Sequence, residues 1–213
     1  MFRVIPGRNP PPIRRPSRRI KRGLDVLLIV LAAPLVLPLL GLCAVAILIE
    51  TGRPVFFFQD RTGVGGRRFR MFKFRTMVPN AEQMKHELAH LNELTWPDFK
   101  ISDDPRVTRV GRFLRRSSLD ELPQLINVLK GDMSLVGPRP TSFAAETYQL
   151  WHTERLEVTP GVTGLWQISG RSDVDFDDRA RLDIEYIENQ SLLYDLSILL
   201  RTVTAIVSKR GAY

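Results

Sequence analysis

Cysteine and histidine are scarce in this chain of 213 residues. The single cysteine, Cys43, excludes a disulfide framework and a zinc site built on cysteine. Three histidines leave little material for a histidine-rich metal centre. Hydrophobic residues make up 44% of the chain and charged residues 25%, which excludes wholesale disorder and allows a buried core. The length suits one domain with an appendage.

Acidic residues are absent from positions 1–22, which carry eight arginines and lysines. The net charge of the chain is +8, so these eight account for the whole excess, and the rest of the chain has 23 basic and 23 acidic side chains. Because the segment is also rich in proline, we expect residues 1–22 to form a flexible basic arm on anionic lipid headgroups. No nucleic-acid partner is expected, since a binder of that class more often shows a basic face on the folded domain.

An uncharged run of 24 residues follows, from Val26 to Ile49. A run longer than about 18 apolar residues is typical of a membrane helix. A buried core helix is the first alternative, but the run is apolar all round. A cleaved signal peptide is the second, but its apolar region is about 7–15 residues long. Asp25 at the edge of the run is expected to pair with Lys21 or Arg22, or to stay hydrated at the interface.

Two features of the run favour a re-entrant helix over 23–50 rather than a single span. Pro34 and Pro38 lie near its middle, and each removes an amide donor and clashes with the preceding turn, so they are expected to break or bend the helix. Positive charge flanks both ends, and such charge favours the cytoplasmic side. A single span stays open as an alternative, because many membrane helices tolerate proline.

The remaining chain, 51–213, is predicted to be a single cytosolic catalytic domain of α+β class, mainly helical. Residues 51–77 have the β-prone runs and central glycines of a hairpin. Gly161 to Gly170 is expected to be a loop. The last helix is amphipathic, and its apolar face is predicted to pack on the core or to lie in the bilayer interface. Hydrophobic periodicity and end signals predict five helices, over residues 79–94, 107–116, 119–130, 176–188 and 192–207.

Asp120 and Glu121 fall in the first turn of the helix predicted over 119–130. One interpretation is structural: Ser118 and Glu121 have the spacing of a capping box, and an acid in a first turn complements the helix dipole. The other is functional: an ionised aspartate is a candidate nucleophile toward phosphorus, and two adjacent carboxylates are candidate ligands for Mg²⁺.

Several cationic side chains are candidate phosphate ligands. Arg139 lies between Pro138 and Pro140, which would fix its backbone and aim its guanidinium, although a structural arginine is an equal alternative. A buried ion pair with an arginine is as good an interpretation of Asp183, which is surrounded by apolar residues, as a catalytic role. Lys73 and Arg75 alternate with apolar residues, so a solvated strand face is also an explanation for them. The further candidate arginines are Arg112, Arg115 and Arg116.

At these residues the sequence resembles the bacterial sugar transferases, or monotopic phosphoglycosyl transferases, over about residues 20–213. The strongest matching stretches are Ser118–Gln124 (SLDELPQ) and Met133–Pro140 (MSLVGPRP). The others are Lys21-Arg22-x-x-Asp25, Phe58-Gln59-x-Arg61-x-Gly63, Lys73–Met77 (KFRTM), Asp104–Thr108 (DPRVT), Pro160–Gly164 (PGVTG), Trp166-Gln167, Asp183-x-x-Tyr186-Ile187 and Gly211-Ala212-Tyr213.

The resemblance implies transfer of a hexose-1-phosphate from a UDP-sugar to undecaprenyl phosphate, with release of UMP, as the start of a lipid-linked glycan such as an exopolysaccharide. Asp120 would be the nucleophile that forms a covalent phosphosugar intermediate, with Mg²⁺ at Asp120 and Glu121. Arg139 would hold phosphate, with Lys73, Arg115 and Asp183 as further site members. It also implies a proline-broken re-entrant helix in the bacterial inner (cytoplasmic) membrane.

The resemblance leaves some points open. The ending Gly-Ala-Tyr is similar to that of short family members that transfer galactose or glucose phosphate, while many relatives carry extra transmembrane helices. No code for the hexose is legible, and a homodimer is one oligomeric state that the sequence allows. Two other functions stay as alternatives: a glycosyltransferase that moves only the sugar and releases UDP, and a non-enzymatic membrane scaffold in polysaccharide assembly.

Overall fold

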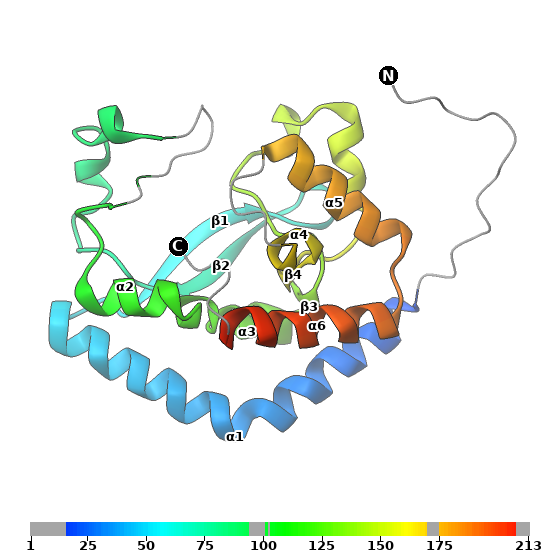
Figure 1. Cartoon of the computed structure of the whole chain (residues 1–213), viewed down its shortest axis with the longest axis horizontal. Helices are drawn as coiled ribbons and strands as arrows, with labels where there is room; N and C mark the ends of the chain where they lie inside the picture. The colour runs from blue at the N-terminus through cyan, green and yellow to red at the C-terminus, as the bar shows by residue number, and fades with distance from the viewer. Residues whose placement is uncertain (1–15, 94–100, 102, 170–174, 208–213) are drawn as a thin grey trace, which may run out of the picture.

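The computed structural model describes residues 16–93, 101, 103–169 and 175–207. The α-helices and strands follow one another along the chain (Figure 1) as α1 Arg18–Thr51, β1 Phe56–Thr62, β2 Arg68–Phe74, α2 Arg109–Arg116, α3 Gln124–Lys130, β3 Ser134–Val136, β4 Gly161–Thr163, α4 Leu165–Ile168, α5 Phe176–Glu188 and α6 Leu192–Val207. Short 3₁₀ helices occupy Val64–Gly66, Gln83–Lys85, Ala89–Leu91, Leu119–Glu121, Ala145–Thr147 and Leu150–Leu156. The structure is therefore mainly helical with a small antiparallel hairpin, as predicted, and it has a second two-stranded sheet that was not predicted.

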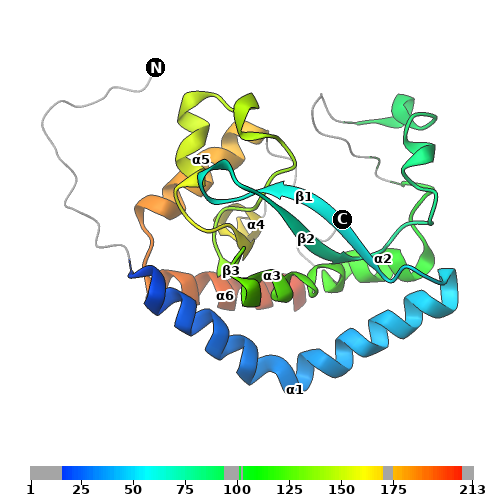
Figure 2. The same ribbon diagram turned by 180° about the vertical axis from the view of Figure 1, so that it is seen from behind.

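Helix α1 is 34 residues long and is continuous through Pro34 and Pro38, which occupy the middle of its residue range. Figures 1 and 2 show that it bends near the middle of its length. In the described part of the chain, α1 is the one helix that is both long enough and apolar enough to cross a membrane. It begins at Arg18, inside the segment expected to be the basic arm, whose residues 1–15 lie outside the described part of the chain.

Within the described part of the chain, α1 buries side chains only near its two ends. Its buried residues are Lys21, Asp25 and Ile29 near the start, and Cys43 and Ile47 near the end. The apolar side chains around the bend are exposed, with Leu31 at 67%, Leu35 at 77% and Leu37 at 63%. The helix therefore touches the domain twice and presents an apolar middle that no described residue covers.

The predicted hairpin is present. Strands β1 and β2 are antiparallel, with a register that runs from Phe56 opposite Phe74 to Thr62 opposite Arg68. Asn127 of α3 covers the outer edge of β2: its Oδ1 accepts a 2.9 Å hydrogen bond from the Phe72 N–H, and its Nδ2 donates a 2.6 Å bond to the Arg70 carbonyl. The hairpin is thereby held against α3.

A second, parallel pair of strands lies at the centre of the domain. Strands β3 and β4 pair through Ser134 with Gly161 and Val136 with Thr163. The prediction of a plain loop over Gly161–Gly170 was wrong in part, because this segment contains β4 and the short helix α4. The largest core cluster packs on these strands from α4, α5 and α6, and consists of Val136, Leu165, Tyr186, Ile187 and Ile198.

Glycine is required where β3 and β4 meet. A Cβ atom added to Gly161 would lie 2.1 Å from the backbone nitrogen of Gly137. A side chain would therefore force the two segments apart, which explains why both positions are glycine.

Two helices expected from periodicity are interrupted. The helix predicted over 79–94 is not formed in its described part, 79–93, which contains two short 3₁₀ turns at Gln83–Lys85 and Ala89–Leu91. The helix expected over 119–130 starts only at Gln124, after a 3₁₀ turn at Leu119–Glu121 and Pro123. Its buried side chains are Gln124, Asn127 and Val128, whereas its apolar side chains Ile126 and Leu129 are exposed.

The helices expected over 107–116, 176–188 and 192–207 are confirmed as α2, α5 and α6. Both views show α2, α3 and α6 along the side of the domain next to α1 (Figures 1 and 2). Asp195 of α6 is buried at 3% exposure. The exposed apolar side chains of these three helices are Phe113, Ile126, Leu129, Leu193, Leu196, Leu200 and Val203.

Candidate active site

Asp120 and Glu121 lie in the 3₁₀ turn that joins α2 to α3. Ser118, just before them, has a φ of 54°, a left-handed conformation that reverses the chain direction at the end of α2. Its side chain makes no capping hydrogen bond, so the capping box is wrong. The Glu121 carboxylate binds side chains from distant parts of the sequence instead.

Glu121 is held by two cations. Lys73 of β2 donates a 2.8 Å hydrogen bond to Oε1, and one terminal nitrogen of Arg139 donates a 3.0 Å bond to Oε2. The other terminal nitrogen of Arg139 binds Oε1, so the arginine grips both oxygens. Burial by itself raises the pKa of Glu121, but the positive charges of Arg139 and Lys73 outweigh it and hold the pKa well below its usual range. Glu121 is therefore ionised at neutral pH.

Asp120 has fewer polar partners than its neighbour Glu121. Its side chain is 13% exposed, and its contact with a cation is long, at 3.9 Å from the Lys73 nitrogen. No hydrogen bond reaches its carboxylate from the described residues. Burial raises the pKa of Asp120, Lys73 acts in the opposite direction, and the negative charge of Glu121 raises it further. Asp120 is therefore a poorly solvated carboxylate whose oxygens are available to a ligand.

Two more arginines border this pair of carboxylates. Arg115 of α2 donates a 2.9 Å hydrogen bond from Nε to the Thr76 hydroxyl, and Asp120 is among the charges that act on it. Arg61 of β1 binds the side chain of Gln59 at 2.6 Å, and burial together with repulsion from Arg139 lowers the pKa of Arg61 to about 10. Arg61 was missed as a site residue, although it stands in one of the motifs that carry the resemblance.

The backbone carbonyl of Arg139 is held by a second arginine, Arg155. Arg155 donates a 2.8 Å hydrogen bond to the Arg139 carbonyl and forms an ion pair with Asp183, whose pKa burial raises to about 6. Asp183 thus has the buried arginine partner that was one of its two interpretations. Arg155 was not anticipated, because nothing in its local sequence marks it.

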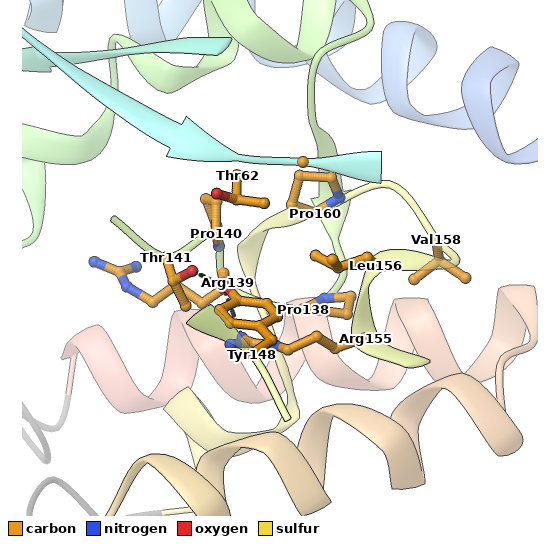
Figure 3. Close-up of a pocket in the computed structure, with 11 residues that line it drawn as sticks. Thr62, Pro138, Arg139, Pro140, Thr141, Tyr148, Arg155, Leu156, Val158 and Pro160 are labelled. Carbon is orange, nitrogen blue, oxygen red and sulfur yellow. Dashed lines mark hydrogen bonds between the residues drawn. The ribbon is translucent and has the colours of Figure 1, made fainter. Parts of the chain in front are cut away.

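A small cavity of about 10 Å³ adjoins this loop. Figure 3 shows Pro140 beside Thr62 at the end of β1, and Arg155 and Leu156 in the segment that completes the lining. The cavity has room for about one water molecule, so it is not where a sugar nucleotide would bind. The groups able to bind phosphate lie instead around Asp120.

Two predicted phosphate ligands lie elsewhere. Arg75 donates hydrogen bonds to the Thr51 hydroxyl at 2.6 Å and to the carbonyls of Thr51 at 3.1 Å and Gly52 at 2.8 Å, so it caps the C-terminal end of α1. Arg112 forms an exposed ion pair of 3.3 Å with Asp103. The structure therefore gives both residues partners outside the carboxylate site.

The carboxylates fit one kind of Mg²⁺ site. The described residues contain no group of three or more acidic, histidine or cysteine side chains able to enclose a metal. Mg²⁺ is often held by one or two carboxylates together with substrate phosphates and water. Asp120, with Glu121 beside it, offers a partial site of this kind, although Glu121 is already engaged by Lys73 and Arg139.

Comparison with known proteins identifies the family of the chain. The model of the bacterial sugar transferase family matches residues 16–209. The chain belongs to the bacterial sugar transferase family. Both stretches that carry the strongest resemblance, Ser118–Gln124 and Met133–Pro140, fall within the matched region.

Three relatives show how similar the chain is to other proteins of the family. It is 43% identical over 209 residues to the undecaprenyl-phosphate galactose phosphotransferase of Salmonella typhimurium, 42% over 198 residues to the exopolysaccharide production protein ExoY of Sinorhizobium fredii, and 43% over 204 residues to the UDP-glucose:undecaprenyl-phosphate glucose-1-phosphate transferase of Caulobacter vibrioides. These matches cover 94%, 91% and 91% of the chain. They cover 43% of the Salmonella protein, 88% of ExoY and 72% of the Caulobacter protein.

Proposed function

We propose that this chain transfers a hexose-1-phosphate from a UDP-sugar to undecaprenyl phosphate and releases UMP. Family membership and the activities that the names of the Salmonella and Caulobacter relatives state support this reaction class. The same relatives make galactose and glucose the first sugars to test. The product would start an exopolysaccharide or another lipid-linked glycan.

The observation that carries the proposal is the contrast between the two neighbouring carboxylates. Both oxygens of Glu121 are occupied by Lys73 and Arg139, whereas Asp120 has one long contact with Lys73. Burying a carboxylate without hydrogen bonds lowers the stability of the folded protein. Its presence therefore indicates a role in function rather than in folding. Nucleophilic attack is such a role, because poor solvation leaves the oxygen lone pairs free.

The chemistry then proceeds in two displacements at one phosphorus atom. An Asp120 oxygen attacks the sugar-bearing phosphorus, and the bond to the bridging oxygen breaks, so that UMP leaves with the electron pair. A phosphate oxygen of undecaprenyl phosphate next attacks the same phosphorus. The bond to Asp120 breaks and the free carboxylate returns, with the sugar now attached to the lipid through a diphosphate.

The surrounding charges suit a diphosphate substrate. Lys73, Arg115, Arg139 and Arg61 supply four positive charges around the two carboxylates. The excess of two positive charges matches the two negative charges of a sugar nucleotide diphosphate. Arginine pairs with phosphate through two parallel hydrogen bonds, and these groups would also stabilise charge that develops on the leaving oxygen.

Mg²⁺ is part of the proposal, with Asp120 and Glu121 as the protein groups at its site. When bound, it would supply additional positive charge at the phosphate oxygens of the donor.

We further propose that α1 is a re-entrant membrane helix, with the catalytic domain on the cytoplasmic face of the bacterial inner membrane. Both ends of α1 pack on the same domain, and its middle is bent and apolar. Helices α2, α3 and α6, which lie along the side of the domain next to α1, carry exposed apolar side chains. Such a surface fits the headgroup boundary of a bilayer. The phosphate of undecaprenyl phosphate lies at that depth, and the UDP-sugar would arrive from the cytosol.

Product analysis tests the proposal. Purified full-length protein is incubated with undecaprenyl phosphate, Mg²⁺ and a panel of UDP-sugars, and the released nucleotide and the mass of the lipid product are measured. UMP together with a lipid-diphosphate-hexose is expected from the wild type. Asp120→Asn should lose this turnover by a factor on the order of 10³ or more, because the nucleophile is gone.

The control is Asp178→Asn, which removes an exposed carboxylate paired with Arg181 on α5 and should leave turnover within about twofold. Release of UDP would contradict the proposal and indicate a glycosyltransferase. No turnover with any sugar would favour the scaffold alternative. Full activity of Asp120→Asn would place the nucleophile elsewhere.

A further inference from the structure

The N-terminal end of α1 is bonded to β3 by a buried carboxylate. Asp25 Oδ2 accepts a 2.7 Å hydrogen bond from the Ser134 hydroxyl, and its Oδ1 accepts a 3.3 Å bond from the backbone N–H of Leu135. Asp25 is 5% exposed and Ser134 is 2% exposed. The two residues are buried in the wall of a cavity of about 440 Å³, and their bonds connect the membrane helix to one particular strand.

A second contact lies one helical turn earlier. Lys21 donates a 2.5 Å hydrogen bond to Asp195 of α6, and the hydroxyl of Tyr186 donates a 2.6 Å bond to the other Asp195 oxygen. The Tyr186 hydroxyl also lies 3.3 Å from the carbonyl oxygen of Val136. Each of the three residues of β3 is thus touched by a group of this cluster.

Strand β3 leads directly into the loop that carries Arg139. Only Gly137 and Pro138 separate Val136 from Arg139, and the two prolines restrict the backbone on either side of it. Backbone bonds from Ser134 N–H to the Pro160 carbonyl at 2.8 Å and from Gly137 N–H to the Thr163 carbonyl at 3.0 Å join β3 to the segment of β4, so the two strands would move as one unit. A shift of β3 would therefore be passed on to the Arg139 guanidinium and its grip on Glu121.

We propose that Asp25 is a positioning residue that holds β3, and with it Arg139, in register with Glu121, so that the seating of α1 on the domain aligns the active site. Asp25 acts through Ser134 and Leu135 and, among the described residues, makes no hydrogen bond or ion pair with Asp120 or Glu121. A displacement of about 1 Å in a catalytic group can cost about 100-fold in rate, so a modest shift would be visible in turnover. The kinetic consequence rests on the proposed transferase function, whereas the coupling of α1 to the Arg139 loop does not.

The test compares two substitutions at one position in the full chain, kept in lipid nanodiscs. Asp25→Ala removes both hydrogen bonds and is expected to lower kcat/KM by about 10- to 100-fold. Asp25→Asn keeps an acceptor for Leu135 N–H and a polar partner for Ser134, and it should retain activity within about threefold of the wild type. Asp132→Ala, two residues before Ser134, removes a carboxylate that pairs with Lys130 and should stay within about twofold.

A measurement independent of activity accompanies the kinetics. Hydrogen–deuterium exchange of the amides in 137–141 should accelerate in Asp25→Ala and match the wild type in Asp25→Asn. The proposal is overturned by unchanged kcat/KM per folded Asp25→Ala molecule, by unchanged exchange in 137–141, or by a loss that Asp25→Asn shares in full. If the wild-type protein releases no UMP, the transferase function fails and the exchange comparison still decides the coupling.

Discussion

Two buried clusters of charge in this protein follow opposite rules. In the cluster that seats α1, all four carboxylate oxygens of Asp25 and Asp195 accept hydrogen bonds from Ser134, Leu135, Tyr186 and Lys21. In the candidate active site, Glu121 is equally well bonded, but its neighbour Asp120 is not. Buried charged groups are normally paired. A cluster in which one carboxylate has no hydrogen bond is therefore expected at a functional site, where activity rather than stability determines which side chains are present.

The largest effect expected from this contrast is on stability. Lys21→Met leaves the Asp195 carboxylate buried without its cation, and breaking a buried pair in this way costs about 3 kcal/mol or more. Asp120→Asn should not lower the free energy of unfolding, because it replaces a poorly solvated charge that the fold disfavours. Thermal denaturation of the two variants at neutral pH makes the comparison.

The matched control is Lys21→Met combined with Asp195→Leu, which removes both charges and should recover part of the loss. Equal destabilisation by Lys21→Met and Asp120→Asn would contradict the distinction between the two clusters.

A smaller effect separates two arginines three residues apart on α2. Arg115→Gln removes a positive charge beside Asp120 and should lower kcat/KM by about 10-fold, as expected for one charge-assisted contact with phosphate. Arg112→Gln removes an exposed partner of Asp103 and should change kcat/KM by less than about twofold. Steady-state kinetics with the preferred UDP-sugar measures both, and a reversed order would return Arg112 to the site.

The smallest effect is a displacement of the pH profile. Burial raises the pKa of Asp120, so the ionised nucleophile is lost as the pH falls through a value above the usual aspartate range. The acid limb of kcat/KM should therefore lie at a higher pH than an ordinary aspartate would give. Lys73→Met removes the largest of the charges that lower the pKa of Asp120, so the acid limb of this variant should move to a still higher pH, whatever its maximum rate. If the acid limb of kcat/KM does not move in Lys73→Met, a group other than Asp120 determines it.

Local sequence patterns predicted the elements whose causes are local. The hairpin over 51–77 follows from two β-prone runs around glycines, and α2, α5 and α6 follow from helical periodicity. The helix expected over 119–130 failed because Pro123 and the left-handed Ser118 divide it. The capping box failed because the partners of Glu121 stand 48 and 18 residues away along the chain.

The sequence by itself determined the uncharged run of α1, the basic N-terminal segment, the adjacent carboxylates and the family to which the motifs belong, since each is a matter of composition or of residues close together in the chain. Only the tertiary structure decided that Glu121 is bound while Asp120 is left available, that Arg75 caps α1, and that Asp25 reaches β3. These outcomes depend on which distant side chains meet in a buried space, where low solvation makes each pairing, or its absence, energetically decisive.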